Sequence, residues 1–179
     1  MRKIRCDACP VRGRSIACDL DASSLDDFAA VGSSAIYRPR QVVYAEGNPA
    51  TGLYLVCHGQ VKLFCSDRFG HEPVIGLLRP GDVFGAFGLD PAGVHATSAE
   101  AVLESQVSHL SAERLSAYLQ RNAQVALRLM AALSEQLARA RRQVRDLAFK
   151  TADSRLASWI VELARSDGGL AAGHRVAVP

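Results

Sequence analysis

The hydrophobic residues in the middle of the chain come in short runs that turn residues separate. Five such runs lie between residues 35 and 110, at 42–44, 53–56, 61–64, 74–77 and 107–110. Glycine and proline stand between the runs, as in Gly47-Asn48-Pro49 and Arg79-Pro80-Gly81. Short apolar runs at this spacing predict the strands of an antiparallel β-roll.

Helical patterns flank the predicted strands on both sides. Two serines at 23–24, followed by acidic and apolar residues, predict a short helix near residues 24–31. A longer helical period begins after Ser111. Its apolar residues recur at alternating steps of three and four, as in a coiled-coil seam. These residues are Ala123, Ala126, Met130, Leu133, Leu137, Ala140, Val144 and Leu147.

Arginine side chains flank this seam, and its eight positions carry no charge. We interpret the arginines as a solvated face in preference to a DNA-binding patch. The sequence therefore predicts a parallel homodimer that forms through residues 123–147. A second helix is predicted at residues 151–166, because Thr151 and Asp153 suit a helix start and Gly168-Gly169 follows its end.

These patterns together predict an α+β fold class, with an antiparallel β-roll followed by a long dimerisation helix and a short second helix. We expect the chain to have four parts. They are a cysteine-containing N-terminal arm at 1–22, a β-roll domain at 23–116, the dimerisation helix at 117–150, and a second helical segment at 151–179.

The composition adds three observations, on charge, on membrane contact and on cysteine content. A formal net charge of +3 neither requires nor excludes contact with nucleic acid. No apolar run approaches the roughly 18 residues of a membrane span, and the N-terminus lacks a signal-peptide core, so we expect a cytoplasmic protein without membrane contact. The chain has five cysteines, which is an odd number. In a cytoplasmic protein this argues against a disulfide framework and favours metal, cluster or redox chemistry.

Several motifs of the predicted roll match those of a known family. In order along the chain they are Gly47, Leu53-Tyr54-Leu55-Val56-x-x-Gly59-x-Val61-Lys62-Leu63, Gly70, Leu78-x-Pro80-Gly81-Asp82-Val83-Phe84-Gly85, and Arg155-Leu156-Ala157-x-Trp159-Ile160 in the second helix. This order resembles the CRP/FNR family of homodimeric bacterial transcription regulators over nearly the whole chain. The resemblance implies a cyclic-nucleotide-binding-like jelly roll that forms a β-roll sensor domain at 23–116, and the start of a truncated DNA-binding domain at 151–179.

In that family a winged helix-turn-helix follows the second helix, and this chain stops where that module would begin. A helix-turn-helix reads bases through its second helix. We therefore expect that this chain does not read DNA sequence. DNA is then a partner only of the full-length protein.

Cyclic-nucleotide members of the family bind the ribose hydroxyl through a Glu and the cyclic phosphate through an Arg. In the matching register this chain has Ala86 and Ala96, and neither can make these contacts. His95 lies beside Ala96, and we interpret it as a solvated loop histidine rather than an anion ligand. The resemblance therefore predicts that the chain does not bind cAMP.

The N-terminal arm contains the better candidate for a sensory site. Cys6-Asp7-Ala8-Cys9 followed by Cys18 resembles the oxygen-sensing FNR-type branch, whose arm cysteines hold a [4Fe-4S] cluster. Thiolates suit iron and sulfide, and the basic residues of the arm stabilise thiolates. The resemblance implies that Cys6, Cys9 and Cys18 are metal and cofactor ligands. Zinc, or an arm that binds no metal, is the alternative.

The fourth ligand of such a cluster has no direct counterpart in this sequence. The register of the family cysteine falls on Ser108, and serine is a poor iron ligand. Cys57, Cys65, His109 and Asp7 are candidates to replace it. The two cysteines, however, lie in strand-like runs, where buried and inert thiols are common.

We do not expect an enzyme, because the sequence has no Gly-x-Ser-x-Gly motif, no phosphate-binding Gly-Lys-Ser/Thr loop and no supported pair of carboxylates. We predict the sensory and dimerisation part of a transcription regulator that responds to oxygen or redox state through an arm-bound iron-sulfur cluster. Two alternatives stay open. One is a regulator that senses a diatomic gas via haem or a small effector in the roll, and the other is a dimerising interaction module without DNA binding.

Overall fold

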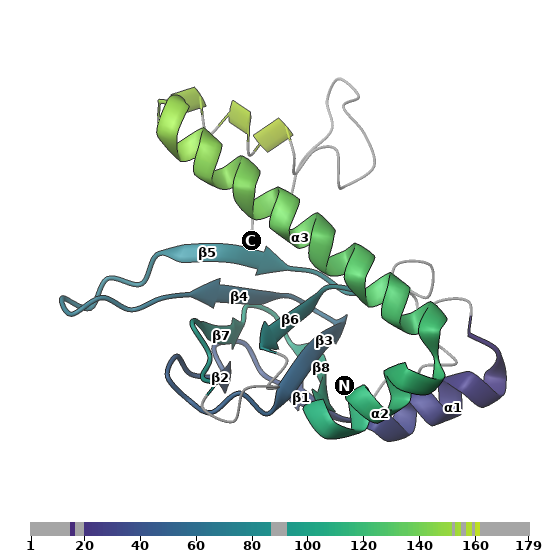
Figure 1. Ribbon diagram of the computed structural model, residues 1–179. Helices are drawn as coiled ribbons and strands as arrows, with labels where there is room; N and C mark the ends of the chain where they lie inside the picture. The colour runs from purple at the N-terminus through teal and green to yellow at the C-terminus, as the bar shows by residue number, and fades with distance from the viewer. Residues whose placement is uncertain are drawn as a thin grey trace, which may run out of the picture. The chain divides into compact units, whose positions relative to one another are not determined.

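The computed structural model describes residues 15–16, 20–86, 93–151, 153–154, 157–158 and 160–161. Within these residues the chain forms a helix, then eight strands, then two further helices (Figure 1). The chain divides into two compact units, Met1–Ala132 and Leu133–Pro179. All the described strands belong to the first unit.

Two antiparallel four-stranded sheets form the centre of the first unit. The first sheet has the strand order β1 (Gly32–Tyr37), β8 (Ser105–Ser111), β3 (Gly52–His58) and β6 (Val83–Ala86). The second has the order β2 (Val42–Tyr44), β7 (Ser98–Ala101), β4 (Val61–Phe64) and β5 (Val74–Leu78). Most neighbouring strands are far apart in the sequence, as in a jelly roll. The predicted antiparallel β-roll is confirmed.

Side chains from both sheets fill the space between them, which we call the roll interior. Val56 and Val107 of the first sheet pack there with Val61 and Ala99 of the second, and all four are fully buried. Its buried residues are Tyr44, Val56, Val61, Leu78, Phe84, Ala99 and Val107. The period of two along each strand places these residues on the inner faces.

The turn between β3 and β4 depends on a glycine. Gly59 has a φ of +82°, and a Cβ there would collide with Ser105 Oγ and with the carbonyl oxygen of Glu104. A residue with a side chain would be strained in this conformation. The Ser105 hydroxyl also accepts the backbone N–H of Gln60 at 2.9 Å, so the turn is fastened to β8.

The helices lie where the sequence predicts them, with one interruption. Helix α1 (Ala22–Val31) matches the predicted helix at 24–31, and the side chain of Asp21 caps it by accepting the N–H of Ser24 at 2.7 Å. The helical period after Ser111 is broken at Asn122 into α2 (Ala112–Arg121) and α3 (Ala123–Phe149). The Asn122 side chain donates to the carbonyl of Tyr118 at 3.0 Å.

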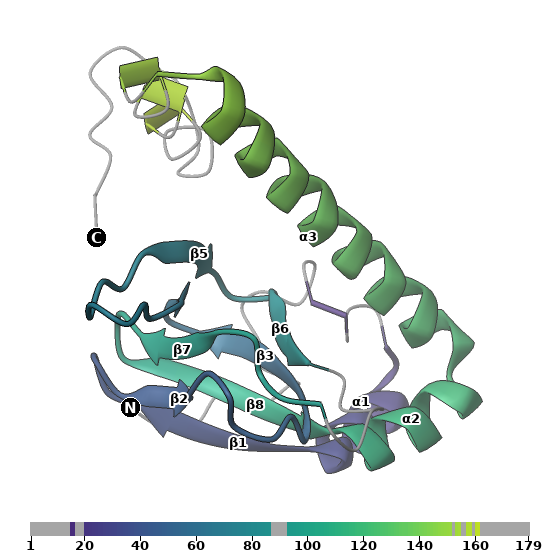
Figure 2. The same cartoon turned by 60° about the vertical axis from the view of Figure 1, so that its left-hand side comes forward.

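Helices α1 and α2 and the start of α3 cover the outer face of the first sheet and form a second cluster, which we call the helix-side core. Figure 2 shows α1 and α2 side by side at one end of this sheet. The rings of Phe28 and Tyr118 meet edge to face at 5.7 Å between α1 and α2. The buried members are Ile16, Leu25, Phe28, Val31, Leu53, Leu55, Val83, Leu110, Leu115, Tyr118, Val125 and Leu129.

The described residues beyond α3 agree with the predicted second helix. Asp153, Ser154, Ala157, Ser158, Ile160 and Val161 are helical. The predicted end of that helix lies outside the described residues. The observed order of a β-roll followed by helices confirms the α+β fold class.

Candidate functional site

Three aromatic side chains from different strands meet inside the roll. The ring centroid of Tyr44 on β2 lies 5.1 Å from that of Tyr54 on β3 and 5.9 Å from that of Phe84 on β6. Gly85 allows this packing, because its φ is +90° and a Cβ there would come within 2.9 Å of the Tyr54 ring. Burial raises the pKa of the Tyr44 hydroxyl, so this group stays neutral in the roll interior.

His95 belongs to this aromatic group and is only 2% exposed. Its ring stacks on that of Tyr44 with 3.7 Å between centroids and 13° between planes. The backbone around it is tied to an earlier turn, because His95 N–H donates to the Asn48 carbonyl and Gly47 N–H donates to the His95 carbonyl, both at 2.9 Å. The interpretation of His95 as a solvated loop histidine is therefore wrong.

A second imidazole, that of His109 on β8, lies beside Tyr54. The ring centroids are 4.8 Å apart, and His109 Nε2 is 3.1 Å from the hydroxyl of Thr51. Burial lowers the pKa of both His95 and His109, and the neighbouring His109 lowers that of His95 further. Both imidazoles are thus held in their neutral form at neutral pH.

The predicted ligands Cys6, Cys9 and Cys18 lie outside the described residues, as does Asp7. The arm residues Ile16 and Leu20, which stand two positions before and two after Cys18, are described. Ile16 is buried in the helix-side core, and Leu20 packs against the same core. These two described arm residues are therefore packed on the first sheet and its helices.

The two other cysteines and Ser108 do not form one group in the roll. Cys57 packs against the helix-side core, and its thiol is 3.8 Å from the carbonyl oxygen of Leu55. Cys65 is 3.9 Å from the carbonyl oxygen of Ala96, and Ser108 pairs with Leu55 across β3 and β8. Among the residues that the structure describes, no three His, Cys, Asp or Glu side chains gather into a metal-binding group.

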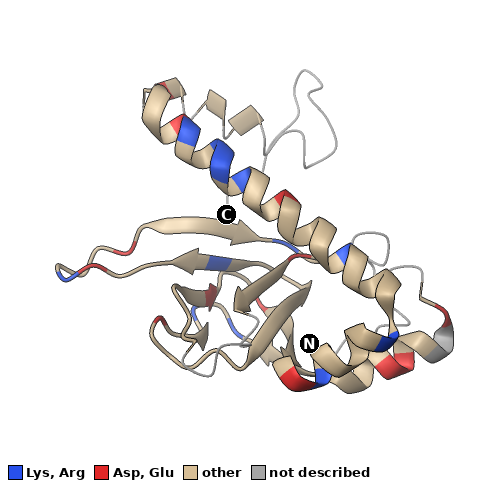
Figure 3. Cartoon of the chain, in the orientation of Figure 1, with Lys and Arg blue, Asp and Glu red and all other residues tan. Residues whose placement is uncertain are grey.

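Helix α3 has two apolar faces with different surroundings. Val125 and Leu129 are buried in the helix-side core. The large residues of the predicted seam, Met130, Leu133, Leu137, Val144 and Leu147, are 41–66% exposed in the single chain. Charged residues recur along α3, as the colours of Figure 3 show, and Arg139 pairs with Glu135 at 3.2 Å. In the described part of the chain no helix is long and apolar enough to cross a membrane.

Comparison with known proteins agrees with this geometry. A family model described as the cyclic nucleotide-binding domain matches residues 35–122. The solved structure of FixK2 from Bradyrhizobium japonicum superposes with a TM-score of 0.69 and 30% sequence identity, and the match covers 83% of this chain and 72% of that one. The chain belongs to the CRP/FNR family.

Relatives of this CRP/FNR-family chain are named as receptors and regulators, in agreement with the prediction that it is not an enzyme. The cyclic AMP receptor protein of Thermus thermophilus is 32% identical over 134 residues, which are 75% of this chain and 62% of that protein. The transcriptional activator protein anr of Pseudomonas aeruginosa is 27% identical over 143 residues, which are 80% of this chain and 57% of that protein. The chain thus spans about 60% of the length of these relatives.

The two alanines that replace the predicted nucleotide contacts of this CRP/FNR-family roll are both described. Ala86 ends β6 and is half-buried, and Ala96 is exposed next to His95. Residues 87–92 between them lie outside the described residues. The aromatic and imidazole group was not predicted from sequence, although Tyr44, Tyr54 and Phe84 each stand in a short apolar stretch typical of a strand, which was a signal that could have found its three aromatic members.

Proposed function

We propose that this chain is the sensory and dimerising part of a CRP/FNR-type transcription regulator that responds to oxygen or redox state. The sensor is a [4Fe-4S] cluster that Cys6, Cys9 and Cys18 hold in the N-terminal arm. Such a cluster supplies reactivity toward oxygen, and the protein supplies the thiolates and a structure that senses their state.

The attachment of the arm to the helix-side core supports this proposal most directly. Ile16 is 3% exposed, and each of the residues Ile16 and Leu20 is two positions from Cys18. Val125 and Leu129 of α3 belong to the same core, so a movement of the arm at Ile16 or Leu20 has a packed route to the helix.

The donor chemistry of the chain fits a cluster, and Cys57 is the candidate that we favour as fourth ligand. It is a thiol that packs against the same core as Ile16 and Leu20, whereas Cys65 lies against the loop at Ala96. His109 already has Thr51 as partner of its Nε2, and a serine hydroxyl at 108 is a poor iron ligand.

The exposed stripe on α3 supports the homodimer. Its large apolar residues follow alternating three- and four-residue steps, and a contiguous apolar surface of this kind is costly to leave in water. A second copy of α3 presents the same stripe, so a parallel pair buries both. DNA binding and transcription control belong to the full-length protein, and a cytoplasmic location remains a prediction.

The decisive experiment is anaerobic purification followed by absorption spectroscopy and by iron and sulfide analysis. We expect a brown protein with a broad absorption that bleaches in air, and about four irons and four sulfides per chain. Serine variants of Cys6, Cys9 or Cys18 should each lose most of both. Cys65→Ser is the matched control and should retain them, whereas Cys57→Ser should not.

Three results would contradict this proposal. They are full iron and sulfide content in all three arm variants, zinc as the single bound metal, and a sharp Soret band. The Soret band would indicate haem and thus the alternative of gas sensing in the roll. Retention of the cluster in Cys57→Ser would reject only the fourth ligand.

A further inference from the structure

The junction after α3 is short and is bridged by polar side chains. The backbone N–H of Lys150 donates to the Asp146 carbonyl at 3.0 Å, which continues the hydrogen bonding of α3. The next residue, Thr151, accepts the N–H of Ser154 on its hydroxyl at 3.4 Å and so caps the helical residues that follow. One helix therefore ends and the next begins at two adjacent residues.

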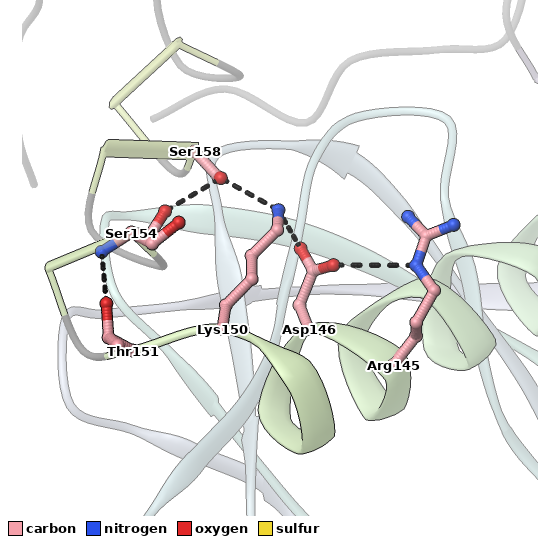
Figure 4. Close-up of polar contacts among 6 residues, drawn as sticks. All are labelled: Arg145, Asp146, Lys150, Thr151, Ser154 and Ser158. Carbon is pink, nitrogen blue, oxygen red and sulfur yellow. Dashed lines mark hydrogen bonds and ion pairs between the residues drawn. The ribbon is translucent and has the colours of Figure 1, made fainter.

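The side chain of Lys150 spans this junction, as Figure 4 shows. Its Nζ lies 2.7 Å from Asp146 Oδ2, one turn back on α3, and donates to the Ser158 hydroxyl at 2.9 Å on the following helical segment. The Ser158 hydroxyl in turn donates to the Ser154 carbonyl at 2.8 Å. Lys150 thus binds both helices at once.

The surroundings of Lys150 favour an ordered contact. The side chains of Lys150 and Asp146 are 32% and 26% exposed, so water and salt screen their pair less than a fully exposed one. Arg145 Nε lies 3.7 Å from the other carboxylate oxygen of Asp146. The hydrogen bond from Lys150, together with the nearby cations, lowers the pKa of Asp146, which keeps this carboxylate charged.

We propose that Lys150 is a positioning residue that fixes the direction in which the chain leaves α3. The i,i+4 pair with Asp146 alone would support only the last turn of α3. The bond to Ser158 adds a contact to the next helix. Without this bond, the backbone torsion angles of Lys150 and Thr151 have one restraint fewer. The contact itself does not depend on the proposed cluster; its relevance to DNA binding rests on the proposed function.

Hydrogen exchange of backbone amides in this chain tests the proposal. In Lys150→Met, which keeps most of the stem but removes the cation and its donors, amides at 153–161 should exchange about three- to tenfold faster, as expected for loss of one or two hydrogen bonds. Lys150→Arg should restore most of the protection. Arg141→Gln removes an exposed charge from the same helix and should leave this exchange unchanged.

The variant Ser158→Ala distinguishes a role of Ser158 in the contact between the two helices from a role in local helix formation. Alanine is the better helix former, so a purely local role of Ser158 predicts equal or slower exchange at 153–161. Bridging predicts faster exchange there, with unchanged protection at residues 125–137 of α3. Exchange like that of the wild type in both Lys150→Met and Ser158→Ala would overturn the proposal. The measurement needs no cluster and no DNA, so failure of the proposed function would not affect it.

Discussion

The helix-side core and the roll interior lie on opposite faces of the same sheet and differ in chemistry. The helix-side core is mostly aliphatic and joins the arm at Ile16 to the sheet, to α2 and to the start of α3. The roll interior contains Tyr44 and Phe84, and the His95 ring stacks within it. The first cluster therefore connects the proposed sensor to the proposed dimer helix. The second fills the inside of the roll with rings and neutral imidazoles.

Removing a large side chain from the helix-side core should have the largest effect. Leu115 on α2 is fully buried, so Leu115→Ala should lower the free energy of unfolding by about 2–5 kcal/mol, through lost burial and the cavity that remains. Urea unfolding at constant protein concentration measures this change. Leu103→Ala, at an exposed loop position, should stay within about 0.5 kcal/mol. A loss below 1 kcal/mol for Leu115→Ala would show that this core does not hold α2.

The exposed stripe of α3 should respond to a charge by losing its partner. Ala140→Asp would place two carboxylates opposite each other in a dimer, and we expect at least about tenfold weaker association, which is 1.4 kcal/mol. Sedimentation velocity over a concentration series measures it. Ala131→Asp makes the same change at an exposed position of α3 outside the seam and should leave the dimer intact. An unchanged dimer in Ala140→Asp, or a monomeric wild type at micromolar concentration, would remove α3 as the interface.

The strands that the sequence could predict differ from the missed strands in the residues that they bury. Strands β3 and β4 contain contiguous apolar runs and were predicted, but β7 was not, because its buried residues Ala99 and Ala101 are alanines with low strand propensity. Pairing with β4 makes β7 a strand, supported by the ion pair of Lys62 and Glu100 at 2.9 Å. β1 and β6 were missed for the related reason that each contains only two or three contiguous apolar residues next to serine or glycine.

Only those residues of the candidate site that follow a sequence spacing or a family register could be predicted from the sequence. The cysteine spacing and the two alanines can be read directly from the chain, but burial of His95 depends on Tyr44, which a different strand supplies. A loop histidine has no periodicity that reports its surroundings. The break at Asn122 is similar, because the helical period runs through it, whereas its backbone leaves the helical conformation and its side chain bonds to Tyr118.

Acid should weaken the roll interior more than the helix-side core. Burial lowers the pKa of His95 below its ordinary value of 6.5, so the unfolded chain binds a proton more readily than the folded one. Above pH 6.5 His95 is neutral in both states, and the free energy of unfolding does not change through this group. As the pH falls from 6.5 toward the folded pKa, the free energy of unfolding decreases by at most about 1.4 kcal/mol per pH unit for one histidine.

Urea unfolding at pH 7.5 and at pH 5.5 tests this expectation. His109 lies in the same group and also has a lowered pKa, so it contributes in the same direction. His95→Phe keeps an aromatic ring against Tyr44 but cannot be protonated, and the loss of stability on acidification should be smaller in this variant. An equal loss in both proteins would assign the acid sensitivity to other groups.

The smallest effect that we expect is the response of the roll to cAMP. Ala86 and Ala96 offer no side-chain donor or acceptor to a ribose hydroxyl or a cyclic phosphate, and each missing charge-assisted hydrogen bond costs about 1.5–3 kcal/mol. His95, the neighbouring cation candidate, is stacked on Tyr44 in its neutral form. Calorimetry with cAMP should therefore show no binding in the micromolar range, and the melting temperature should not change.

The cyclic AMP receptor protein of Thermus thermophilus is a suitable positive control in the same buffer. Micromolar affinity for cAMP would mean that this roll binds the nucleotide without these two side chains, and that its aromatic interior is an effector site rather than a filled one.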